Sequence, residues 1–146
     1  MTIRFATISD EKQIFELFDE CTNYLHSEGK PSKIGKGVFR KIIKQGEVKI
    51  FVAQDKGKLV GLATFYLIPN IRHGWNRGLI EDFFVTQSMR QHGVGTSIFK
   101  AIKKYCIKNN IKVVKLDSAV HLLAAHKFYE KHGGVIYGQT FRFVMF

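Results

Sequence analysis

The chain has 146 residues, of which 45% are hydrophobic and 13% aromatic, so it can form one domain with a core and is not a disordered chain. Its 23 lysine and arginine residues exceed its 12 aspartate and glutamate residues, which gives a formal net charge of +11. This charge favours an anionic partner. Composition does not choose among nucleic acid, an acidic membrane surface and a phosphorylated cofactor.

Cysteines and apolar runs restrict the class of protein further. Cys21 and Cys106 form no CxxC pair, so the sequence indicates neither a disulfide framework nor a structural zinc site. No apolar run approaches the ~18 residues that a membrane span needs, and the N-terminal stretch lacks the apolar centre of a signal peptide. We therefore expect a soluble, cytoplasmic protein with no membrane partner.

Strand and helix periods alternate from the N-terminus onward. Residues 2–7 alternate between polar and apolar and predict a strand, after which Ser9 and Asp10 offer an N-cap for a helix. A loop at 27–35 precedes a short second helix. Residues 55–58 (DKGK) lie between two apolar stretches and predict a β-hairpin turn. The apolar faces of the two helices consist of Ile14, Phe15, Leu17, Phe18 and Cys21 in the first and Val38, Ile42 and Ile43 in the second.

The second half of the chain continues the alternation. Its expected elements are a polar loop at 69–78, a strand at 79–85, a helix at 94–109, a strand at 112–118, a short helix at 124–133 and a final strand at 135–146. The first of these helices carries an apolar stripe formed by Val94, Ile98, Ala101, Ile102 and Tyr105. No linker or internal repeat interrupts the pattern, so we expect a single α/β domain over residues 1–146, with helices packed on a sheet.

A glycine pair opens the helix at 94–109, in the stretch RQHGVG (90–95). The first amides of a helix point outward with the positive end of its dipole behind them, and Gly93 and Gly95 would let an anion approach them closely. Arg90 would add a positive charge at the rim. The pattern is not a Walker loop, because no Gly-Lys-Ser/Thr follows, and not a Rossmann fingerprint, because Ile98 stands where the third glycine would be. From these residues alone, a pyrophosphate cradle and an ordinary tight turn are both open.

Two motifs resemble the GCN5-related N-acetyltransferase (GNAT) superfamily. The stretch IEDFFVTQSMRQHGVGTSI (80–98) resembles the strand and cofactor loop of small-amine and polyamine acetyltransferases. The stretch AAHKFYEKHG (124–133) resembles a helix of aminophosphonate and aminoglycoside-type acetyltransferases. The resemblance implies that superfamily's fold, an α/β protein with a mixed, mostly antiparallel twisted sheet of six to seven strands flanked by about four helices.

The resemblance also implies acetyl-CoA as co-substrate. The pyrophosphate would bind the loop amides, and the pantetheine arm would pair with the backbone at the end of the preceding strand. The implied contact residues are Phe83, Phe84, Val85, Arg90, Gln91, His92, Gly93, Val94, Gly95, Thr96, Leu122 and Ala125. Leu122 departs from the family, because many relatives have an asparagine there whose amide bonds the cofactor.

Catalysis needs a base for the amine and an acid for the departing thiolate. Glu81 and Asp82 are neighbours on a strand, so we expect them to face opposite sides of the sheet. The resemblance implies that Glu81 is the base, acting directly or through water, and that Tyr129 protonates the sulfur of CoA. Without the resemblance, the favoured interpretation of Glu81 is a surface or salt-bridged carboxylate, and that of Tyr129 is a buried aromatic. The six histidines show no metal-ligand spacing, so no metal is expected.

The implied activity is direct acetyl transfer from acetyl-CoA to a primary amine of a small molecule, in a ternary complex without a covalent enzyme intermediate. A homodimer is compatible with the sequence. The alternatives are a protein or peptide N-acetyltransferase, a non-catalytic CoA-binding protein and a nucleic-acid-binding module. The last is disfavoured because the chain has no RRM, KH or zinc-finger pattern. Asp19, Glu20 and Glu28 form the only acidic cluster that could line a polyamine pocket.

Overall fold

A computed structural model describes residues 1–25, 36–46 and 48–145, and the chain falls into two compact units, 1–115 and 116–146. The loop expected at 27–35 and the acidic residue Glu28 lie outside the described residues.

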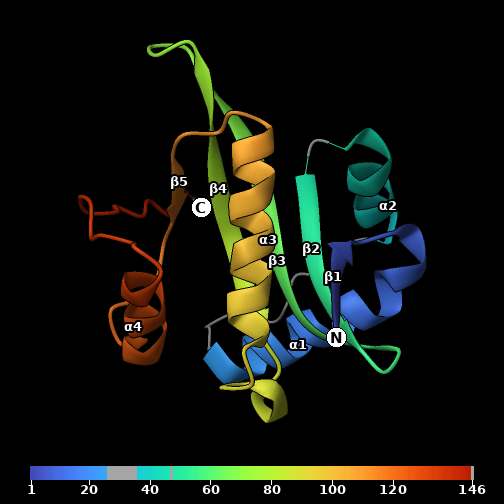
Figure 1. Cartoon of the computed structure of the whole chain (residues 1–146). Helices are drawn as coiled ribbons and strands as arrows, with labels where there is room; N and C mark the ends of the chain where they lie inside the picture. Colours follow the sequence, from blue (N-terminus) through green and yellow to red (C-terminus); the bar gives the residue numbers. More distant parts are fainter. Residues whose placement is uncertain (26–35, 47, 146) are drawn as a thin grey trace. The chain divides into compact units, whose positions relative to one another are not determined.

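One mixed five-stranded sheet forms the centre of the first unit, with its strands in sequence order (Figure 1). They are β1 (Thr2–Phe5), β2 (Val48–Asp55), β3 (Lys58–Asn70), β4 (Trp75–Val85) and β5 (Val114–Leu116). The first four pair as antiparallel neighbours. The described sheet thus has five strands where six to seven were expected, and β5 is shorter than the predicted strand at 112–118.

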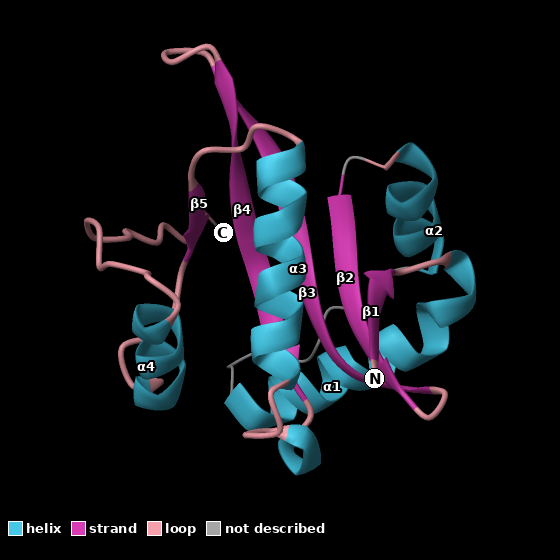
Figure 2. Cartoon of the chain, viewed as in Figure 1, coloured by secondary structure: helices cyan, strands magenta, loops and turns pink. Residues whose placement is uncertain are grey.

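Helices cover both faces of this sheet (Figure 2). They are α1 (Glu11–Leu25), α2 (Lys36–Gln45) and α3 (Val94–Lys108). Ile14 and Leu17 of α1 pack with Phe39 of α2 and with the side chains of one face, which include Val48, Ile50, Val52, Leu62 and Phe84. On the opposite face, Val94, Ile98 and Ile102 of α3 are buried, which confirms the predicted apolar stripe. The prediction for α2 was wrong at one position. Val38 is 50% exposed and Phe39 is buried in its place.

The hairpin turn between β2 and β3 is confirmed. Asp55 pairs with Lys58, and the two residues between them, Lys56 and Gly57, both have positive φ, 47° and 82°. This is the turn geometry whose twist matches paired strands. The expected loop at 69–78 was too long, because β3 continues to Asn70 and β4 begins at Trp75. Pro69, Gly74 and Gly78 interrupt the alternation of polar and apolar residues in this stretch, so the ends of the two strands looked like a loop.

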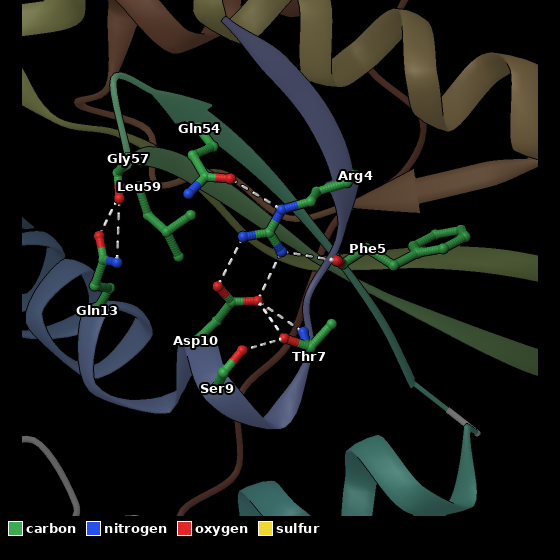
Figure 3. A network of polar contacts seen from close by, with 9 residues as sticks. All are labelled: Arg4, Phe5, Thr7, Ser9, Asp10, Gln13, Gln54, Gly57 and Leu59. Atoms are coloured by element: carbon green, nitrogen blue, oxygen red, sulfur yellow. Dashed lines mark hydrogen bonds and ion pairs between the residues drawn. The ribbon is translucent and has the colours of Figure 1, made fainter.

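A polar network fixes the start of α1 (Figure 3). The short helical turn Ile8–Asp10 precedes α1, and Thr7 is the N-cap of that turn, two and three residues before the predicted caps Ser9 and Asp10. Asp10 is 5% exposed and accepts hydrogen bonds from both terminal nitrogens of Arg4 (2.7 and 2.8 Å) and from the amide of Thr7 (2.8 Å). The Arg4 guanidinium lowers the pKa of the Asp10 carboxyl to about 2.

The second unit contains α4 (Leu123–Lys131). The helix predicted at 124–133 is confirmed, and it ends at a glycine: Gly133 has φ 88°, and the amide of Gly134 donates to the carbonyl of Tyr129 (2.9 Å). The final strand predicted at 135–146 was wrong for its described residues, 135–145, which have no strand structure. Alternating residues can form a strand only where a partner pairs with them, and Val135, Ile136 and Phe143 are more than 80% exposed.

Candidate active site

The loop ahead of α3 has the backbone of an anion-binding turn. Gly93 caps the helix with φ 78°, and Gln91, two residues earlier, also has positive φ (63°). The first bond of the helix runs from the Ser97 amide to the Gly93 carbonyl (3.0 Å), so the helix's own ladder does not use the amides of Val94 and Gly95. A Cβ at Gly93 would meet nothing within 4 Å. Amides aimed outward beside open space form the concavity in which phosphate groups bind.

Arg90 lies differently from its expected place at the rim of this loop. Its Nε donates a hydrogen bond to the Val85 carbonyl (3.0 Å), and its guanidinium carbon lies 3.8 Å from the ring centroid of Tyr24 on α1. The Phe84 ring is also close, at 5.3 Å. This stacking and hydrogen bonding fix the loop against α1 and the end of β4. Contact of Arg90 with a cofactor stays a prediction.

Glu20 holds the same loop, a role that no sequence pattern indicated. Its carboxylate accepts hydrogen bonds from the Thr86 hydroxyl (2.7 and 2.8 Å) and from the Gln87 amide (3.0 Å). Glu20 and Thr86 are 66 residues apart, so only the fold reveals the pair. Together, Glu20 and Arg90 join the loop ahead of α3 to α1.

A bulge in β4 corrects the predicted orientation of the two acids. Ala63 pairs with Phe83 and Phe65 with Ile80, so Glu81 and Asp82 together oppose the single residue Thr64. The extra residue breaks the alternation of side chains along the strand. Asp82 accepts a hydrogen bond from the Thr64 hydroxyl (2.7 Å), and its amide donates to the same oxygen (2.9 Å). Both carboxylates therefore lie on the α1 side of the sheet, where opposite sides were expected.

Glu81 borders an open hollow on this face. The hollow has a volume of 370 Å³ and is lined by Tyr66, Leu67, Ile68, Leu79 and Glu81. Burial raises the pKa of Tyr66, and the negative charges of Asp82 and Glu81 raise it further. Tyr66 thus carries a neutral hydroxyl close to two acids. The sequence alone does not identify Tyr66 as a site residue, because its position beside Glu81 depends on the pairing of Tyr66 with Leu79. The hollow can accept a cationic amine next to an exposed carboxylate.

The end of β4 carries the residues expected to meet the pantetheine arm. Phe84 is 5% exposed and belongs to the core that contains Ile14 and Leu17. Phe83 lies on the other face, with its ring 6.4 Å from that of Phe99 on α3. Val85 is half-buried, and its carbonyl is the acceptor for Arg90. Their side chains thus have packing roles, and pairing of their backbone with a cofactor stays a prediction.

The remaining loop residues are largely exposed. His92 is exposed, and its Nδ1 lies 2.7 Å from the Arg90 carbonyl. Gln91 is exposed and Thr96 is half-buried in the first turn of α3.

Tyr129 lies in the second unit, on α4, where it is half-buried beside Phe128 with ring centroids 5.6 Å apart. Burial raises the pKa of its phenol. Leu122 caps α4, and its carbonyl accepts the amide of His126 (3.1 Å). Ala125 is half-buried on the same helix.

Cysteine, metal and membrane features add no other chemistry to the described part. Cys106 is buried, Cys21 is half-buried against the core on the predicted apolar face of α1, and both are free thiols. Burial raises the pKa of Cys21 to about 11, so this thiol is a weak nucleophile. Among the described residues, no three histidine, cysteine or acidic side chains gather to hold a metal ion. No helix in the described ranges has the length and apolar character to cross a membrane.

Comparison with known proteins adds independent evidence. The model of the Acetyltransferase (GNAT) family matches residues 11–134. An uncharacterised N-acetyltransferase of Bacillus subtilis (strain 168), YhfO, is 24% identical over 133 residues, which cover 91% of this chain and 89% of that protein.

Solved structures agree with this match. A putative acetyltransferase from Agrobacterium tumefaciens is 26% identical, with a TM-score of 0.85 over 99% of this chain and 100% of that one. An aminoglycoside acetyltransferase from an uncultured soil metagenomic sample has a TM-score of 0.84 over 99% of this chain and 95% of that one, and its 17% identity shows a shared fold.

The matched residues include both parts of the site in the first unit, the loop ahead of α3 and the acid-bearing bulge of β4. They include α4 with Tyr129 as well. Acetyl-CoA is the co-substrate of this family. The chain belongs to the GNAT acetyltransferases and is an acetyl-CoA-dependent N-acetyltransferase.

Proposed function

We propose that the chain transfers the acetyl group of acetyl-CoA directly to a primary amine of a small molecule, in a ternary complex and without an acetylated enzyme. One observation carries the proposal: a single compact unit combines an amide-lined loop at the start of α3 with the exposed carboxylate of Glu81 beside an open hollow. The first feature suits a pyrophosphate, and the second suits an amine.

The loop residues 91–96 would hold the pyrophosphate of CoA. Gly93 supports this role because its missing side chain leaves the approach to the backbone open. Glu20 and Arg90 would act on the cofactor indirectly, by holding the loop in shape. Acetyl-CoA supplies the activated thioester. The chain orients the thioester, removes a proton from the amine and gives a proton to the departing thiolate.

Glu81 would take the proton of the attacking amine, directly or through water. Its exposed position allows either route. Asp82, held by Thr64, adds a second negative charge that attracts a cationic amine to this end of the hollow. Tyr129 would give its proton to the sulfur as the carbon–sulfur bond breaks. The raised pKa of Tyr129 supports this role, because the phenol keeps its proton at neutral pH.

The structure gives less information about the chemical class of the amine acceptor than about the type of reaction. One of the acids considered for a polyamine pocket, Glu20, is already engaged by Thr86 and Gln87. Glu28 lies outside the described residues, so its part in such a pocket stays a prediction. Membership of the polyamine or aminophosphonate branch stays a hypothesis. The alternatives are a protein or peptide acceptor, and CoA binding without turnover.

Release of free CoA in the presence of an amine panel tests the proposal. We expect thiol release that depends on an amine and falls at least about tenfold in Glu81→Gln, the variant that removes the base but keeps the side-chain shape. A polyamine, an aminoglycoside, an amino acid and a peptide should be included so that the acceptor classes are compared directly. CoA binding without thiol release from any amine would support the non-catalytic alternative instead.

A further inference from the structure

The hairpin of β3 and β4 extends the face that carries Glu81. Tyr66 pairs with Leu79 and Ile68 pairs with Arg77, without a bulge between them. Directly opposed residues share a face, and alternate residues of one strand do as well. Arg77 therefore lies on the same face as Glu81, with Leu79 between them. In Figure 1 the two strands continue beyond the ends of the other strands.

The far end of this face is cationic and aromatic. Arg77 is half-buried and forms no hydrogen bond or ion pair with any residue of the described ranges. Trp75 follows on the same face, opposite Asn70, and the rings of Trp75 and His73 stack with centroids 5.5 Å apart at 20°. Residues 67–80 include Arg72 and contain no aspartate or glutamate, so no acid at this end of the hairpin offsets these charges.

The two charged ends are separated by apolar surface. Leu79 lies between Glu81 and Arg77 on this face, and both Leu79 and Ile68, the residue opposite Arg77, line the hollow beside Glu81. Four residues separate the two along β4, which corresponds to about 13 Å between their Cα atoms at the usual rise of a strand. The face thus presents an acid, an apolar middle and a base in sequence. A ligand that fits it has an amine at one end and a negative charge at the other.

We propose that the acceptor is an amine that carries an anionic group at the end remote from the amino group, and that Arg77 recognises this anion. The inference rests on the proposed function, because Glu81 marks the position of the reacting amine. A free α-amino acid is too short to reach both ends. A polyamine or an aminoglycoside would place a second positive charge beside Arg77. The chain's net charge of +11 would also repel such a polycation. An ω-amino carboxylate and a peptide N-terminus with an acid a few residues along share the required chemistry.

Three acceptors of equal length separate the possibilities: 8-aminooctanoate, octylamine and 1,8-diaminooctane, with acetyl-CoA as donor. They share an eight-carbon chain and differ in the group at the far end, which is anionic, neutral or cationic. We expect kcat/KM to fall in that order, by at least about fivefold from the carboxylate to the diamine after correction for its two amines. The peptides Ala-Ala-Ala-Glu and Ala-Ala-Ala-Gln, both amidated at the C-terminus, form a second arm. Preference for the Glu peptide identifies a peptide source, and acetylation of 8-aminooctanoate alone identifies a small molecule.

Arg77→Gln should bring the three kcat/KM values together, and Arg77→Lys should restore part of the preference. Arg72→Gln is the matched control. It removes the same charge from the same hairpin, but at the exposed turn, and should preserve the order. A diamine acetylated as well as the carboxylate, or an order unchanged in Arg77→Gln, would overturn the inference and leave the proposed function intact. Failure to acetylate any amine would instead contradict the proposed function.

Discussion

Gly93→Ala tests the backbone geometry on which the cofactor loop depends. Gly93 has φ 78°, and a Cβ there would meet nothing within 4 Å, so the substitution introduces conformational strain without a clash. An L-residue in the left-handed region costs about 1–2 kcal/mol. For a chain of this length, that loss corresponds to a fall of about 2–8 °C in Tm. Thermal unfolding followed by circular dichroism measures it.

Gly57→Ala is the matched control, because Gly57 has φ 82°, is equally open and lies in the turn between β2 and β3. Both variants should lose similar stability. Gly93→Ala alone should also weaken CoA binding at least about tenfold, the effect of losing one hydrogen bond to a charged group. Calorimetric titration with CoA measures the difference. If the two variants bind CoA equally well, the loop is only a turn and the reasoning is refuted.

Three other predictions concern a fold contact, a catalytic residue and a positioning residue. Asp10→Asn should cost about 2 kcal/mol at pH 7, because the folded pKa of about 2 lies below the usual aspartate pKa of 3.8. In the wild type this contribution is present above pH 3.8 and should disappear as the pH falls towards 2, which urea unfolding across that range checks. Tyr129→Phe should lower kcat at least about tenfold and leave the Kd of acetyl-CoA unchanged, as single-turnover kinetics can show; wild-type turnover would make Tyr129 a packing residue. Glu20→Ala should weaken CoA binding about tenfold through loss of the contacts to Thr86 and Gln87; Glu20→Gln should restore part of the affinity in the same titration, and equal affinity in all three proteins would argue against a positioning role.

The sequence predicted correctly those elements that are determined by residues close together in the chain. The turn at 55–58 follows from a glycine between two apolar strands, and the buried stripe of α3 follows from its period of 3.6. The fold class and the family could also be predicted, because the motif residues 80–98 combine strand, loop and helix in one continuous stretch.

Features that depend on pairing could not be predicted in the same way. The bulge that brings Glu81 and Asp82 to one side exists only through the register between β3 and β4. The contacts of Glu20 join residues far apart in the sequence. Residues 135–145 alternate as a strand would, but alternation does not supply the partner that a strand requires.

The fate of the acetyl group tests the central claim most directly. The protein is mixed with acetyl-CoA labelled in its acetyl group and with a primary amine, and both protein and amine are analysed by mass spectrometry at successive times. We expect the label to appear on the amine in step with release of free CoA, and the mass of the protein to stay unchanged throughout. Label that accumulates on the protein, or CoA release without an acetylated amine, would contradict direct acetyl transfer.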